Sequence, residues 1–148
     1  MGRARMRKPL DENEERRSAN LKIDDVMARR VVTAHPHHTV AHVRNLMQRN
    51  RIQAVPVVGP EDEAVGIVTA TDLIDDLKDG TPISGIMTER VYKVPAYNGV
   101  DVAARIMRKN KIHHVVVTHE QKVVGIVSSF DLLRLVEGRR FAVKNATD

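Results

Sequence analysis

The chain repeats itself at a spacing of about 60 residues, and this repeat constrains its fold more than any other feature. The pair Val26-Met27 returns as Ile86-Met87, and the closing motif Gly66–Leu73 returns 59 residues later as Gly125–Leu132. A period of this length indicates two copies of one supersecondary unit and not a solenoid of short repeats. Two copies in a small chain usually pack face to face, so the groove between them is the natural place for a ligand.

The core of each copy must be aliphatic. The 148 residues are 42% hydrophobic but only 3% aromatic, and Trp is absent. The absence of Cys excludes disulfides, thiolate metal sites and a cysteine nucleophile. No apolar run reaches the length of a membrane span, and the N-terminus lacks the apolar stretch of a secretory signal. We therefore expect a cytoplasmic protein without a membrane partner.

The net charge of +5 is concentrated at the N-terminus. Residues 1–22 hold seven basic and four acidic residues, which leaves 17 of the 24 basic and 15 of the 19 acidic residues for the remaining chain. The sequence predicts a flexible basic leader over residues 1–19 and a loose polar tail over 139–148. Because aromatic stacking platforms are scarce, nucleic acid is expected to bind through the leader or not at all.

Within each copy the apolar pattern predicts strand, helix, strand, strand, helix. Pro56 indicates an edge position or a missing hydrogen bond in its strand. The predicted class is α+β, with two tandem β-α-β-β-α units, residues 20–79 and 80–138, packed as a pseudo-two-fold pair. The expected strands are 31–33, 54–58, 64–68, 91–92, 114–118 and 123–127, and the expected helices are 40–50, 72–78, 100–110 and 131–137.

The motif Gly66–Asp72 is the strongest candidate site. Thr69 and Thr71 place hydroxyls where a strand turns into a helix, and the Asp72 carboxylate can accept both hydrogen bonds of a ribose diol. The alternative is that these side chains only cap the helix. In the second copy Phe130 stands in the place of Thr71, where it either narrows a pocket or packs in the core or a dimer.

Four histidines, His35, His37, His38 and His42, precede and begin the first long helix. His38 and His42 are four residues apart and could share a helix face. No carboxylate is close in sequence and no cysteine exists, so we expect a polar loop and no metal site.

Taken in order, these motifs resemble the cystathionine β-synthase (CBS) domain. The residues that carry the resemblance are the opening x-Met, the segment Ile-x-x-Val-Pro-Val-Val and the closing Gly-Ile-Val-[Thr/Ser]-x-x-Asp-Leu. Two such units in tandem resemble a Bateman module over roughly residues 20–138. The resemblance implies an α/β-type CBS fold and a stand-alone CBS pair without an attached enzyme domain.

The resemblance also implies a ligand. CBS pairs bind adenosine-containing ligands such as AMP, ADP, ATP or S-adenosylmethionine between the copies, with the Asp on the ribose and hydroxyls near ribose or phosphate. Basic residues at the entry to a strand contact the phosphate of the ligand that the other copy's Asp holds, which would assign the two adjacent histidines of the second copy to the Asp72 ligand. The implied ligand-binding set is Asp72, Thr69, Thr71, His113, His114, Ile52, Ala54, Thr33, His35, Asp131 and Ser128.

Each part of this set has a structural alternative. Strand alternation points His113 and His114 to opposite faces, so one exposed and one partly buried histidine without a ligand is the plain reading. Ile52 is equally suited to the core.

No catalytic motif is present, so no enzymatic activity, catalytic residue or required cofactor is expected. The expected function is a homodimeric regulatory sensor that binds an adenine nucleotide, AMP, ADP or ATP, and acts on an unknown partner protein. Two alternatives stay open: a ligand-free homodimeric protein–protein scaffold, and nucleic-acid association through the basic leader.

Overall fold

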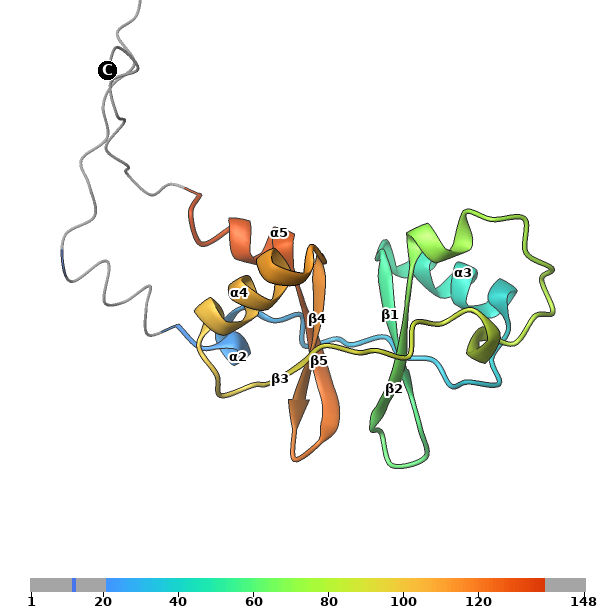
Figure 1. The fold of residues 1–148 in the computed structure, drawn as a ribbon, viewed down its shortest axis with the longest axis horizontal. Helices are drawn as coiled ribbons and strands as arrows, with labels where there is room; N and C mark the ends of the chain where they lie inside the picture. The colour runs from blue at the N-terminus through green and yellow to red at the C-terminus, as the bar shows by residue number, and fades with distance from the viewer. Residues whose placement is uncertain (1–11, 13–20, 138–148) are drawn as a thin grey trace, which may run out of the picture.

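The computed structural model describes residue 12 and residues 21–137, drawn in colour in Figure 1. The predicted leader, apart from Glu12, and the predicted tail lie outside the described residues. In the described part, no helix is both long and apolar enough to cross a membrane.

Both repeats contain one long helix, an antiparallel strand pair and a short closing helix. The first repeat comprises α3 (Val40–Asn50), β1 (Ala54–Val58), β2 (Ala64–Thr69) and the 3₁₀ helix η1 (Ala70–Leu73). The second comprises β3 (Lys93–Pro95), α4 (Val100–Asn110), β4 (His114–His119), β5 (Lys122–Ser128) and α5 (Ser129–Leu133). Two short helices, α2 (Ile23–Val26) and η2 (Ile83–Gly85), open the repeats. The α+β class and both long helices agree with the sequence prediction.

The long helices begin and end where their capping residues dictate. The Thr39 hydroxyl accepts a hydrogen bond of 3.2 Å from the His42 amide at the start of α3. Arg51 and Lys111 end α3 and α4 in the left-handed conformation, with φ of 52° and 54°. The helices therefore end at Asn50 and Asn110, and β1 and β4 each begin four residues later.

Pro56 explains why the two sheets differ. In the second repeat the Val116 amide donates to the Tyr92 carbonyl over 3.0 Å, and β3 joins β4 and β5 in a three-stranded sheet. Pro56 occupies the equivalent position in β1 and has no N–H to donate. The first sheet is therefore two-stranded, and Ala34 forms an isolated bridge to Val57 at its β1 edge.

The predictions of strands at 31–33 and 91–92 were wrong in detail. Residues 31–33 form no strand, because Pro56 removes the hydrogen bond that would pair them. The third strand of the second sheet lies at 93–95, two residues later than predicted.

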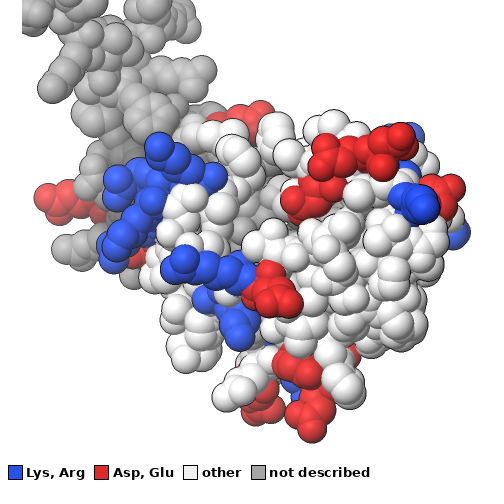
Figure 2. Space-filling view, turned by 45° about the vertical axis from the view of Figure 1, so that its right-hand side comes forward, with Lys and Arg blue, Asp and Glu red and all other residues white. Residues whose placement is uncertain are grey.

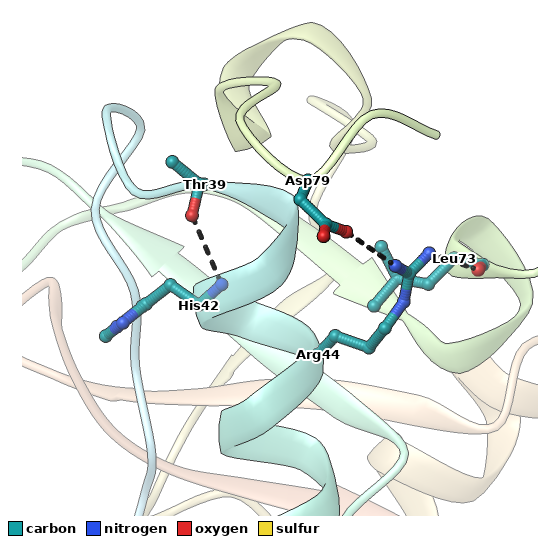
Figure 3. A network of polar contacts seen from close by, with 5 residues as sticks. All are labelled: Thr39, His42, Arg44, Leu73 and Asp79. Atoms are coloured by element: carbon teal, nitrogen blue, oxygen red, sulfur yellow. Dashed lines mark hydrogen bonds and ion pairs between the residues drawn. The ribbon is translucent and has the colours of Figure 1, made fainter. Parts of the chain in front are cut away.

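The predicted closing helices were too long. The helix expected over 72–78 is a 3₁₀ turn that stops at Leu73, whose carbonyl accepts a 3.1 Å hydrogen bond from Arg44 (Figure 3). Asp75 and Asp76 follow, and acidic side chains are unfavourable at the C-terminal end of a helix. The helix expected over 131–137 spans Ser129–Leu133, and turns follow it.

The two sheets face each other, with α3 on one outer side and α4 and α5 on the other (Figure 1). Val55 and Val57 of β1 pack in the first core, whereas Ala54 and Val58 alternate with them and are also buried. β1 contacts β5, and the Val123 amide donates to the Asp62 carbonyl over 2.9 Å. The predicted face-to-face pairing of the copies therefore buries the second face of each sheet.

The opening segments are exchanged between the repeats. Helix α2 lies beside the second repeat, where Ile23 is part of the buried core and its amide donates to the Asn98 carbonyl over 2.8 Å (Figure 1). In turn Ile83 of η2 belongs to the core of the first repeat, and its amide donates to the His38 carbonyl over 2.7 Å. Each core is thus completed by the other copy's opening segment.

Each exchanged opening segment places a methionine against the glycine of the closing motif in the other repeat. A Cβ atom added to Gly66 would lie within 2.9 Å of the side chain of Met87, and one added to Gly125 would lie 2.7 Å from the Met27 sulfur and 3.0 Å from the Ala28 carbonyl oxygen. The distances to the two methionine side chains are shorter than real Cβ atoms show in folded proteins. The opening x-Met and the glycine of the closing motif are therefore two sides of one contact.

We expect Gly125→Ala to lower the free energy of unfolding by about 1–3 kcal/mol, because the new methyl group meets backbone as well as the Met27 side chain. Gly80→Ala is the matched control, since a Cβ there has no heavy atom within 4 Å. Urea unfolding of both variants measures the difference. Equal midpoints for the two variants would contradict the role assigned to this contact.

Candidate functional site

A cavity of about 1090 Å³ lies between the two repeats. Equivalent residues of both copies line it: Ile52 with Ile112, and Asp72 with Asp131. The cavity is at the upper end of the size of ordinary small-molecule sites. The repeat therefore produces one cavity with two similar halves.

Most of the predicted site residues meet in this cavity. Thr33 and His35 do not line it, and the His35 ring contacts the Val58 carbonyl oxygen over 3.2 Å at the turn before α3. The predicted residues that do line it are Ile52, Ala54, Thr69, Thr71, Asp72, His113, His114, Ser128 and Asp131.

The two aspartates cap the closing helices through one oxygen only. Asp72 Oδ2 accepts hydrogen bonds from the Thr69 amide, 2.8 Å, and the Thr69 hydroxyl, 3.2 Å. Asp131 Oδ2 accepts the same pair from Ser128, at 2.8 and 3.0 Å. Capping is therefore confirmed, and among the described residues these bonds leave Oδ1 of each carboxylate free to accept hydrogen bonds from a ligand.

His113 and His114 lie beside the closing helix of their own repeat. His113 is exposed and its Nδ1 lies 3.4 Å from the Ser129 hydroxyl, while His114 is half-buried, as strand alternation predicts. Burial lowers the pKa of His114 below its ordinary value, the neighbouring His113 lowers it further, and the Asp131 carboxylate opposes them. His114 is therefore close enough to Asp131 to feel its charge, and its assignment to a ligand at Asp72 stays a prediction.

Five basic side chains in the cavity wall were missed by the sequence analysis. Two pairs follow the repeat, Arg30 with Arg90 and Arg51 with Lys111, and Arg134 belongs to the second repeat alone. The 60-residue spacing of both pairs was the available signal. These cations make an anionic ligand favourable. Figure 2 shows a group of basic side chains on one part of the molecular surface, whereas basic and acidic side chains lie close together elsewhere on the same face.

The two halves of the cavity differ at the closing motif. Thr71 offers a hydroxyl in the first half, where the second half has the ring of Phe130. Phe130 is 75% exposed, so it is not part of the core. The Phe130 ring is therefore part of the wall of the second half of the cavity.

The described part of the chain contains no cluster of side chains that could hold a metal ion. No three His, Cys, Asp or Glu side chains of residues 21–137 are placed to hold one ion. The four histidines near α3 contact one another outside the cavity and are considered below.

Comparison with known protein families finds the same two-copy repeat. The CBS domain matches residues 23–79 and 83–138. Among curated relatives, inosine-5'-monophosphate dehydrogenase of Methanocaldococcus jannaschii is 30% identical over 76% of this chain. L-aspartate semialdehyde sulfurtransferase of the same organism is 30% identical over 87% of it. The chain spans only 23% and 26% of the length of these two enzymes.

Solved structures of similar fold are CBS pairs. The CBS domain pair of protein MJ0100, in complex with 5'-methylthioadenosine and S-adenosyl-L-methionine, has a TM-score of 0.74 and 30% identity, covering 80% of this chain and 97% of that one. The CBS domain of a CBS domain containing membrane protein from Sphaerobacter thermophilus has a TM-score of 0.74 and 25% identity, covering 83% and 92%.

We expect Asp131→Asn to lower the pKa of His114 further, because it removes the one charge that raises this pKa. NMR titration of the imidazole resonances measures the change. Asp72→Asn is the matched control and leaves the titration of His114 where it is. If Asp72→Asn changed the pKa of His114 more than Asp131→Asn does, His114 would belong to the first half of the cavity.

Proposed function

Because the chain belongs to the CBS domain family, we propose that it is a regulatory module that binds an adenine nucleotide between its two repeats. The observation that carries this proposal is the single cavity, in which one aspartate of each closing motif and basic residues of both repeats come together. Ligand occupancy would then be passed to a partner protein.

The lining of the cavity suits the three parts of a nucleotide. Ile52, Ala54 and Ile67 supply an apolar wall for adenine. The free Oδ1 of Asp72 accepts hydrogen bonds from the ribose hydroxyls. The arginine and lysine side chains of the wall, together with His113, meet the phosphate.

The complex of protein MJ0100 supports an adenosine-containing ligand, because 5'-methylthioadenosine and S-adenosyl-L-methionine share that group. The excess of cations in this cavity favours a phosphorylated member of the class, AMP, ADP or ATP. We assign the first ligand to the Asp72 half, where Thr69 and Thr71 both carry hydroxyls. Phe130 makes the Asp131 half the weaker phosphate site.

Binding without turnover follows from the same set of residues. The cavity wall holds hydroxyls, carboxylates and cations. The Ser129 hydroxyl lies 3.4 Å from His113 Nδ1, but no hydrogen bond among the described residues orients this imidazole from its other nitrogen, as a catalytic base requires. The enzymes that resemble this chain do so over about a quarter of their length. The proposal is therefore a sensor and not a catalyst.

The opening segments give the sensor a route for its response. Ala28 and Arg30 come from the first, Thr88 and Arg90 from the second, and all four line the cavity. A ligand that contacts both segments stabilises the arrangement of repeats that it binds best, in proportion to its differential affinity.

A second copy of this chain is the proposed partner of the exposed apolar face formed by the closing segments. Ile74 and Leu133 are equivalent by the repeat and are 77% and 57% exposed, and Phe130 and Val136 extend the same segments. Exposed large apolar side chains at equivalent positions suit a symmetric contact between two copies.

We expect Asp72→Ala to weaken AMP binding about tenfold or more, close to 1.4 kcal/mol, because the ribose loses its acceptor. Asp75→Ala, an exposed acidic residue outside the cavity, is the matched control and binds AMP as the wild type does. Isothermal titration calorimetry with AMP, ADP, ATP, adenosine and S-adenosylmethionine measures both variants.

Three outcomes would overturn parts of this proposal. Equal affinity of the Asp72 and Asp75 variants would remove the ribose assignment. No binding of any adenosine compound to the wild type would favour the scaffold alternative. Binding of RNA that falls steeply with salt and vanishes on removal of residues 1–19 would favour the nucleic-acid alternative.

The double variant Ile74→Asp, Leu133→Asp is expected to be monomeric where the wild type is a dimer, because it places charges in the apolar contact. Light scattering coupled to gel filtration gives the mass. Tyr97→Asp, an exposed aromatic residue in the turn before α4, is the control and remains dimeric. A dimer of unchanged mass in the double variant would place the interface elsewhere.

A further inference from the structure

Each long helix receives the opening segment of the other copy at the turn that precedes it. The His38 carbonyl accepts from the Ile83 amide over 2.7 Å, and the Asn98 carbonyl accepts from the Ile23 amide over 2.8 Å. The next hydrogen bond of each contact is also matched. The Ser84 amide donates to the Pro36 carbonyl over 3.1 Å, and the Asp24 amide donates to the Ala96 carbonyl over 3.0 Å. The molecule therefore contains two matching docking contacts, made by η2 on the first repeat and by α2 on the second, and their side chains differ.

The side chains of the first docking contact are four histidines in mutual contact. The ring centroids of His37 and His38 lie 4.6 Å apart, those of His38 and His42 4.3 Å, and those of His35 and His38 5.3 Å. The second docking contact has Pro95, Tyr97, Asn98 and Val102 at the equivalent positions. Only the first contact can therefore gain charge near neutral pH.

The surroundings of the cluster oppose a positive charge. Burial lowers the pKa of His38, and His42, His37 and His35 lower it further, with no carboxylate of the described chain among the causes. The cluster sits at the N-terminus of α3, where the helix dipole disfavours cations.

The docked segment supplies no acid to the rings. The carbonyl of Asp79 accepts from the Ala41 amide over 3.1 Å, and the Asp79 carboxylate faces Arg44 at 3.5 Å (Figure 3). The other groups that this segment turns toward α3 are the Thr81 carbonyl, which accepts from Val40 over 2.9 Å, and Pro82, which bridges Thr39.

We propose that the four-histidine cluster makes the docking of residues 79–84 on the first repeat sensitive to protons, whereas the equivalent docking of residues 21–24 on the second repeat is not. Protonation places like charges side by side at the start of α3 and weakens the backbone contacts that hold Ile83 and Ser84. The proposal does not depend on nucleotide binding.

The direction of the pH dependence follows from the lowered pKa of His38. A folded-state pKa of His38 below the ordinary 6.5 means that the neutral ring is favoured in the folded molecule, and that the associated stability is present above pH 6.5 and is lost as the pH falls below 6.5. His114 has a lowered pKa too, so a measurement on the whole molecule would mix the two sites. A local measurement separates them.

Hydrogen exchange of backbone amides in the full chain tests the proposal with an internal control. Between pH 7.5 and 5.5 the protection factors of Ile83 and Ser84 should fall about three- to tenfold more than those of Ile23 and Asp24. Protection factors are corrected for intrinsic exchange at each pH, so the two docking contacts are compared under identical conditions.

The variant His37→Tyr, His38→Asn, His42→Val replaces three of the four histidines by the equivalent residues of the second docking contact and keeps His35. In this variant the extra loss of protection at Ile83 and Ser84 should disappear, while His114→Gln, the control, retains it. Equal loss of protection at both docking contacts of the wild type would overturn the proposal without any variant. An extra loss that persists in the triple variant would do the same.

Discussion

The structure depends on one reciprocal contact, in which the methionine that opens each repeat lies on the glycine that closes the other. Met87 reaches Gly66 and Met27 reaches Gly125, at distances that leave no room for a Cβ atom. Close packing of this kind is sensitive to a single added methyl group. It holds the two sheets face to face, and the facing sheets in turn define the cavity.

The site follows from this pairing more than from any single motif. Asp72 and Asp131 are each occupied through one oxygen in capping their own short helix, so the same carboxylate both forms the local structure and offers an acceptor to the cavity. The opening segments contribute their basic side chains to the same walls. A ligand in the cavity would therefore contact the segments that join the repeats.

Much of this arrangement could be predicted from the sequence, because it rests on local patterns. The apolar spacing of the long helices gave their bounds, and alternation along β4 placed His113 and His114 on different faces. The exchange of opening segments could not be predicted, since a repeat is equally consistent with each segment packing on its own copy.

The remaining differences have local causes. Thr33 and His35 were assigned to the site by the family resemblance, but Pro56 prevents the strand expected over 31–33 and neither residue lines the cavity. Acidic residues after Leu73 shortened a helix that its apolar spacing favoured. Arg30 and Arg90 were missed although they follow the repeat, because neither lies in an apolar pattern or in one of the motifs.

The exchange of opening segments also bears on how the chain folds. Ile23 completes a core whose other members begin at Val94, so the second core contains a contact across some seventy residues of chain. Contacts this distant in sequence slow folding, because a long loop must close before they form. The first core needs Ile83 from the second opening segment and the second core needs Ile23 from the first. Because neither core is complete from the residues of its own repeat, the pair behaves as one cooperative folding unit.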